Sequence, residues 1–131
     1  WNGSGFVKNV DDNCTQVGAA NIGLANYAGN LAAGETVVST GGAFNAGGGG
    51  LTFSKPGATN NGSVDLVVNL GAIVIEAPCI TLTPDPVTAG ANLGYLQSKW
   101  CGAAYDKDPT ARVTFGVYKG NNEFIFQREN Y

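Results

Sequence analysis

The C-terminal residues 111–131 alternate apolar and polar side chains, and this pattern restricts the fold more than any other feature of the chain. From Val113 to Val117, every second side chain is apolar, which is typical of a β-strand with one buried face. A turn-forming run, Lys119-Gly120-Asn121-Asn122, separates it from a second strand over residues 123–128. We therefore predict a C-terminal β-hairpin, with structural positions at Phe115, Gly116, Tyr118, Gly120, Phe124 and Phe126.

This hairpin needs partners from the rest of the chain. In its second strand, Phe124 and Phe126 share one face and Ile125 faces the other way. A two-stranded hairpin is marginal in water by itself, so the preceding residues must supply further strands and a core.

Composition favours many short strands and tight turns. Twenty of the 131 residues are glycine, roughly twice the usual share of about 7%. We predict one all-β domain over residues 1–131, an antiparallel β-sandwich of immunoglobulin-like or jelly-roll type. For residues 22–33 a helix is an open alternative, because Ala and Leu are good helix formers. The expected strands before the hairpin lie at 6–7, 15–17, 21–28, 36–40, 51–54, 64–70 and 72–75. Residues 80–83, between proline-containing turns, are either an edge strand or an extended linker.

Charge and residue types exclude several classes of function. A net charge of −3 argues against nucleic acid as a partner, and no apolar run approaches the roughly 20 residues that span a bilayer. The chain has no histidine, so it lacks a Ser-His-Asp or Cys-His device. The acids Asp65, Glu76 and Glu123 stand singly at positions that we expect to face solvent, and Arg112 is expected to pair with a loop acid. We predict no catalytic, cofactor-binding or metal-binding residues.

The three cysteines are an odd number without a zinc or haem spacing. In an oxidising compartment we expect a disulfide between Cys79 and Cys101, whose loop closure would contribute roughly 3 kcal/mol. Cys14 is then either buried and free or paired across subunits. Three reduced, buried thiols are the alternative.

Acidic residues in two loops raise the question of calcium. Asp106 and Asp108 have a spacing with which oxygen ligands reach a hard cation, and Asp11-Asp12-Asn13 is a second acidic turn. The alternative, which we favour, is that these residues form Asx turns, in which the side chain bonds to nearby backbone.

Two segments near the C-terminus carry a resemblance to a known family. They read DPTARVTFGVYKG at 108–120 and FIFQRENY at 124–131, with looser matches in WNGSGFV at 1–7, DDNCT at 11–15 and GLTFSKPG at 50–57. The chain resembles the C-terminal domain of MshQ-like proteins, secreted bacterial proteins associated with mannose-sensitive haemagglutinin pili. In those relatives the segment before Asp-Pro usually reads Trp-Asp-Gly-Asp-Gly. Here Trp100-Cys101-Gly102-Ala103-Ala104 lacks both acids, so a calcium site is not carried over.

The resemblance implies the C-terminal part of a longer secreted precursor, and it supplies no catalytic residues. We expect a non-catalytic extracellular structural or adhesion module at the bacterial cell surface. A filament subunit that polymerises by strand addition is the alternative, and it would leave an open groove in the isolated domain. The expected partners are other protein subunits, including copies of the same chain, and a surface glycan.

Overall fold

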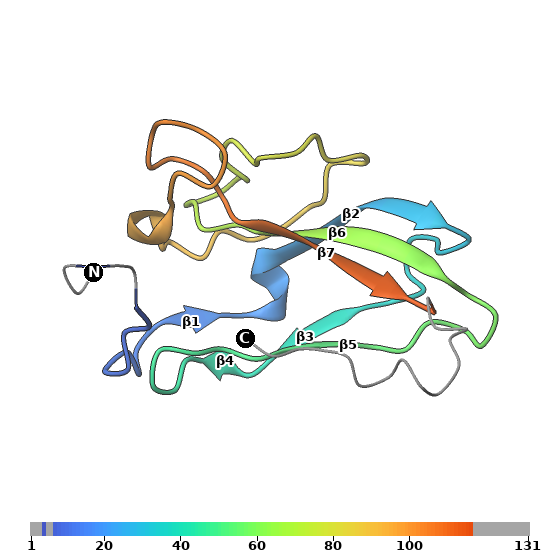
Figure 1. Ribbon diagram of the computed structural model, residues 1–131, viewed down its shortest axis with the longest axis horizontal. Helices are drawn as coiled ribbons and strands as arrows, with labels where there is room; N and C mark the ends of the chain where they lie inside the picture. Colours follow the sequence, from blue (N-terminus) through green and yellow to red (C-terminus); the bar gives the residue numbers. More distant parts are fainter. Residues whose placement is uncertain (1–3, 5–6, 117–131) are drawn as a thin grey trace.

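The computed structural model describes Ser4 and residues 7–116 (Figure 1). Over these residues the chain is all-β, with small antiparallel sheets, two 3₁₀ turns and no α-helix. None of the helices in this described part is long enough to cross a membrane. The elements are β1 (Gln16–Val17), η1 (Ala19–Asn21), β2 (Ile22–Gly29), β3 (Val38–Thr40), β4 (Gly42–Ala43), β5 (Leu51–Phe53), β6 (Gly62–Val68), η2 (Gly94–Leu96) and β7 (Thr110–Phe115).

A three-stranded sheet with the order β2-β6-β7 forms the centre of the molecule. Its middle strand, β6, places Val64 opposite Val113 of β7 and Leu66 opposite Leu24 of β2. Val64 and Leu66 are buried, as the alternation predicted. The expectation of a strand over 21–28 is confirmed, and the helical alternative for 22–33 is wrong because β2 pairs along its length with β6.

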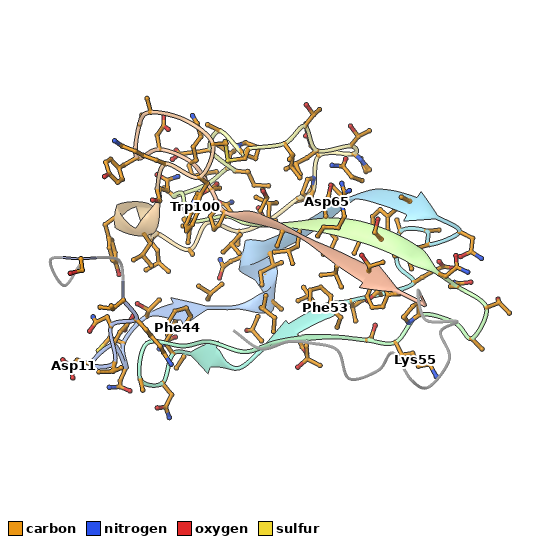
Figure 2. The ribbon with its side chains drawn as sticks, in the orientation of Figure 1. Asp11, Phe44, Phe53, Lys55, Asp65 and Trp100 are labelled. Atoms are coloured by element: carbon orange, nitrogen blue, oxygen red, sulfur yellow. A yellow bond between two sulfur atoms is a disulfide. The ribbon has the colours of Figure 1, made fainter. Side chains whose placement is uncertain are left out.

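Two short ribbons, β3-β5 and β1-β4, form a layer on one side of this sheet (Figure 1). The Phe53 ring of β5 meets the Phe115 ring of β7 edge to face, with 6.4 Å between centroids. Figure 2 shows Phe53 among the side chains that occupy the space between the layers. The two ribbons are tied together by the Thr40 hydroxyl, which donates to the Val17 carbonyl at 2.9 Å.

The opposite face of the central sheet is covered by the long irregular segment 69–109. Ala25 and Val67 are buried there against Leu82, with Ile75 and Ile80 packed around them. The segment lies so close to β2 that a Cβ on Gly23 would overlap Pro86. Both faces of the central strands are therefore buried.

The strand expected at 72–75 does not form, so that prediction is wrong. The chain leaves the sheet at Asn69, whose side chain accepts from the Gly71 backbone N–H at 3.1 Å and donates to the Thr88 hydroxyl at 2.9 Å. These bonds replace the ladder that a continuing strand would need. Residues 80–83 also form no strand, which leaves the linker of the two interpretations of this run.

The remaining strand predictions differ in extent. Strands form within 15–17, 36–40 and 51–54, and β6 overlaps the predicted 64–70 but begins at Gly62 and ends at Val68. Val7 belongs to no strand, and Phe6 is outside the described residues. Of the predicted hairpin, the first strand is present as β7, which contains Phe115 and is followed by Gly116. Tyr118, Gly120, Phe124 and Phe126 lie outside the described residues. The immunoglobulin-like or jelly-roll type stays a prediction.

Candidate functional site

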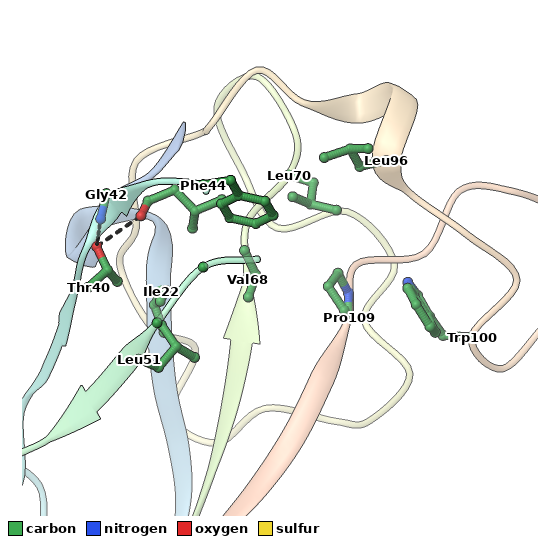
Figure 3. Close-up of a pocket in the computed structure, with 13 residues that line it drawn as sticks. Ile22, Thr40, Gly42, Phe44, Leu51, Val68, Leu70, Leu96, Trp100 and Pro109 are labelled. Carbon is green, nitrogen blue, oxygen red and sulfur yellow. Dashed lines mark hydrogen bonds between the residues drawn. The ribbon is translucent and has the colours of Figure 1, made fainter. Parts of the chain in front are cut away.

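The candidate site is an apolar groove of about 440 Å³ between the central sheet and the ribbon layer (Figure 3). Ile22 and Val68 stand opposite each other on β2 and β6 and form its floor. The ribbon layer contributes Leu51 and Phe44, and the segment before β7 contributes Leu96, Trp100 and Pro109. Three of these side chains are partly in solvent: Trp100 is 57% exposed, Leu51 44% and Leu96 38%.

The groove offers almost no polar chemistry. Among the residues that the structure describes, its lining includes one hydroxyl, that of Thr40, and no ionisable side chain. That hydroxyl is already bonded, because it donates to the Val17 carbonyl at 2.9 Å and accepts from the Gly42 backbone N–H at 3.1 Å. The described part of the lining can therefore hold apolar side chains, and its single hydroxyl is already engaged in hydrogen bonds of the fold.

Asp108 lies beside the groove but is fully buried beneath the loops. Its carboxylate accepts from the backbone N–H of Glu76 at 2.8 Å, from the Gln97 side chain at 3.1 Å and from the backbone N–H of Leu70 at 3.2 Å. These donors come from three separate parts of the 69–109 segment. Asp108 therefore joins the segment internally and is closed to solvent.

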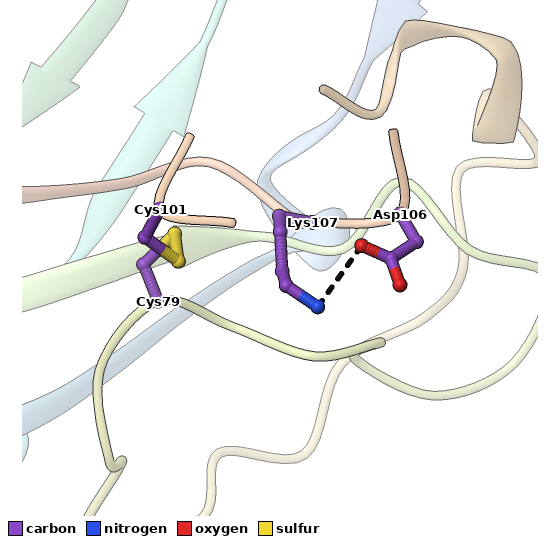
Figure 4. The surroundings of a disulfide bond; sticks show 4 residues. All are labelled: Cys79, Cys101, Asp106 and Lys107. Carbon is purple, nitrogen blue, oxygen red and sulfur yellow. Dashed lines mark ion pairs between the residues drawn. A yellow bond between two sulfur atoms is a disulfide. The ribbon is translucent and has the colours of Figure 1, made fainter. Parts of the chain in front are cut away.

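The structure separates the two aspartates that were considered for calcium. Asp106 is exposed and pairs with Lys107 at 2.9 Å (Figure 4), whereas Asp108 is buried. In the other acidic turn, Asp12 accepts from the backbone N–H groups of Cys14 and Thr15 at 3.1 and 2.9 Å, as an Asx turn does. The Thr15 hydrogen bonds also lower the pKa of Asp12. No group of three possible metal ligands occurs within the described part of the chain.

Asp65 corrects the expectation that its side chain faces solvent, because only 3% of the residue is exposed. Arg112 is directly opposite on β7 and donates to both carboxylate oxygens, at 2.7 and 3.1 Å, while Asn26 donates at 3.0 Å. The hydrogen bonds from Arg112 lower the pKa of Asp65, and burial opposes the shift. Arg112 thus pairs with an acid on the neighbouring strand and not, as expected, with a loop acid.

Of the other two acids, one faces solvent as expected and the other falls outside the described residues. Glu76 is exposed but lies in a loop, where it accepts from the Gln97 side chain at 3.2 Å. Glu123 is outside the described residues. Alternation could have placed Asp65 on the second face of the central strand, but nothing local indicated that a distant loop covers that face.

A disulfide joins Cys79 to Cys101, with 5.6 Å between their Cα atoms (Figure 4). It links two parts of the segment that covers the central sheet, so it limits how far this cover can open. Cys14 is free and exposed, which corrects the expectation of a buried free thiol. The alternative of three reduced thiols does not describe this structure.

Comparison with known proteins identifies one family. The family model for DUF6701, fourth domain, matches residues 1–130. No curated protein and no solved structure shows significant similarity to the chain.

Proposed function

The chain belongs to the DUF6701 family as its fourth domain, and we propose that it is a non-catalytic structural module of an extracellular bacterial surface protein. The observation that carries this proposal is the groove, whose lining is apolar and has no ionisable side chain over the part of the chain that the structure describes. Such a surface suits contact with another protein segment, because burying apolar area is favourable without any directed chemistry. The resemblance of residues 108–131 to MshQ-like proteins supports a pilus-associated role in display or adhesion.

The buried polar groups support the same proposal. Asp65 and Asp108 are saturated by side-chain and backbone donors of the fold itself, so neither carboxylate is available as an acid or a base for a substrate. The Cys79–Cys101 disulfide is consistent with an extracytoplasmic location, where oxidising conditions preserve such bonds. We further propose that the two layers belong to a β-sandwich.

Bacterial cells that display the intact surface protein test this function. Removal of residues 1–131 from it should reduce attachment of the cells to a surface, or the amount of associated pilus, while the remaining protein is still exported. Attachment and pilus amounts equal to those of unaltered cells would contradict the proposal. A reproducible chemical turnover by the purified domain would do so as well.

A second candidate function is a filament subunit that accepts a strand from a neighbouring copy. The open groove favours it, since strand-accepting subunits present such a groove when isolated. The purified chain would then form polymers whose length increases with concentration, visible by electron microscopy. A monomer at all concentrations, measured by light scattering after size-exclusion chromatography, would exclude this candidate.

A further inference from the structure

We propose that the groove is filled by residues 123–128 of the same chain, with Phe124 and Phe126 inserted between the two layers. This inference rests on the proposed function in one respect, namely that the groove receives a protein segment. It goes further by naming the segment, and it makes the groove part of an intramolecular core.

The first observation is the position at which the described chain ends. Strand β7 ends at Phe115, opposite Gly62 of β6, and the Phe115 ring already contacts Phe53 of the ribbon layer. The next residue, Gly116, has φ +69°, and a Cβ there would lie 2.7 Å from the Cβ of Asn61. The described chain therefore ends at a glycine with left-handed backbone, next to the Phe115 ring that bridges the two layers.

The second observation is the distance to the groove. Leu51, which lines the groove, is two residues from Phe53 along β5, a separation of about 7 Å. Ten residues lead from Gly116 to Phe126, and an extended chain of that length reaches about 33 Å. This reach exceeds the separation of about 7 Å along β5. The proposed segment is therefore long enough to reverse direction and place Phe126 beside Leu51.

The third observation is that the groove and the segment match chemically. The groove walls are aliphatic and aromatic, and Leu51, Leu96 and Trp100 are left partly exposed. Within residues 123–128, the two phenylalanines share a face and the polar residues are at the ends. Two strands have a free edge to which the segment could add. Within the described residues, β5 pairs only with β3, and β7 pairs only with β6.

The same chain is favoured over a second copy because its segment is tethered next to the groove. A short tether gives an effective concentration in the millimolar range, which exceeds the concentration of other copies in dilute solution. The segment is therefore expected to bind in its own chain before it meets another.

Photo-crosslinking in the full chain tests this proposal. The photoreactive residue p-benzoylphenylalanine is placed at Phe126, with a matched control at Ile125, which faces the other way. We expect position 126 to crosslink to peptides that contain Leu51 or Trp100, and position 125 not to do so. Crosslinks from position 126 only to other regions would overturn the proposal.

An equal mixture of ¹⁴N- and ¹⁵N-labelled chains identifies the donor of the segment. Crosslinked peptides from a single label support insertion within one chain. Mixed-label pairs would overturn the intramolecular proposal and favour strand exchange between copies, while the structural role proposed above would stand. The two proposals therefore fail on different results.

Stability gives a second measurement. Phe126→Ser should lower the melting temperature by on the order of 10 °C and raise the fluorescence of the dye ANS, which binds to exposed apolar surface. Ile125→Ser, the matched control, should change both much less. Equal effects of the two substitutions would contradict insertion of Phe126. If Phe126→Ser does not fold, the crosslinking measurement still decides.

Discussion

At the scale of single residues, the molecule places its two buried carboxylates where they join separate segments. Asp65 connects two neighbouring strands through Arg112, and Asp108 connects three parts of one long loop. In each case the carboxylate is buried and several donors point at it. Because a donor left without its acceptor in a buried site is costly, these residues should matter more to stability than exposed acids do.

We predict that Asp65→Asn lowers the free energy of unfolding by about 1–3 kcal/mol at neutral pH, because it removes a charged acceptor from Arg112. The folded-state pKa of Asp65 is lowered below the usual value. Its stabilising contribution is therefore present above the unfolded-state pKa of about 3.9 and is lost as the pH falls through the lowered folded-state pKa. Urea unfolding between pH 7 and pH 2 should show the two proteins converging at acid pH. A difference that persists unchanged to pH 2 would contradict this role.

Asp108→Ala should destabilise the protein by about 3–5 kcal/mol, since it leaves the N–H groups of Leu70 and Glu76 without their buried acceptor. The matched control is Asp106→Ala, two residues away, because Asp106 is exposed. Thermal and urea unfolding of the two variants should differ clearly. Similar stabilities would show that the buried hydrogen bonds of Asp108 contribute little.

At the scale of elements, the irregular segment 69–109 replaces a regular layer over one face of the central sheet. It packs Leu82 against Ala25 and Val67, and its backbone is held by Asn69, Asp108 and the disulfide. Such a cover lacks the repeated ladder of a sheet. Its order consequently depends on a few side chains and one covalent link.

Removal of the disulfide tests this dependence. The double variant Cys79→Ser, Cys101→Ser should lose roughly 3 kcal/mol of unfolding free energy, as expected for a closed loop of about 20 residues. Amide hydrogen exchange in residues 69–109 should accelerate more than in β6. Cys14→Ser serves as the control, since that thiol is free and exposed. A larger effect from Cys14→Ser would show that the stabilising bridge is a different one.

At the scale of the whole molecule, the two layers enclose a groove that the described residues do not fill. The C-terminal segment, if it inserts as proposed, makes this groove a part of the core. The module would then present a closed surface to its partners. If copies exchange the segment instead, the same groove becomes the joint of a filament. The crosslinking experiment with mixed labels therefore decides between a closed module and a polymer.

Much of the architecture could be predicted from local pattern, because alternation directly reports the buried inner face of a strand. The predicted strands at 51–54, 64–70 and 112–118 illustrate this, because β5 lies within the first range and β6 and β7 overlap the other two. The pattern was misleading at 72–75, where an apolar run is held in a loop with Ile73 76% exposed. A short apolar run does not by itself specify a strand. The Asn69 side chain donates to the Ile73 carbonyl at 3.3 Å, and local pattern does not identify this bond.

The amino-acid sequence alone determined the all-β class and the main strands of the central sheet, since these depend on periodicity and turn residues. It favoured Cys79 and Cys101 as the bonded pair but left three reduced thiols open as an alternative. Only the tertiary structure decided the burial of Asp65 and Asp108 and the existence of the groove. The physical reason is that burial of a side chain depends on what distant chain covers it. For Asp65 the covering segment begins after β6 and returns over the second face of the sheet.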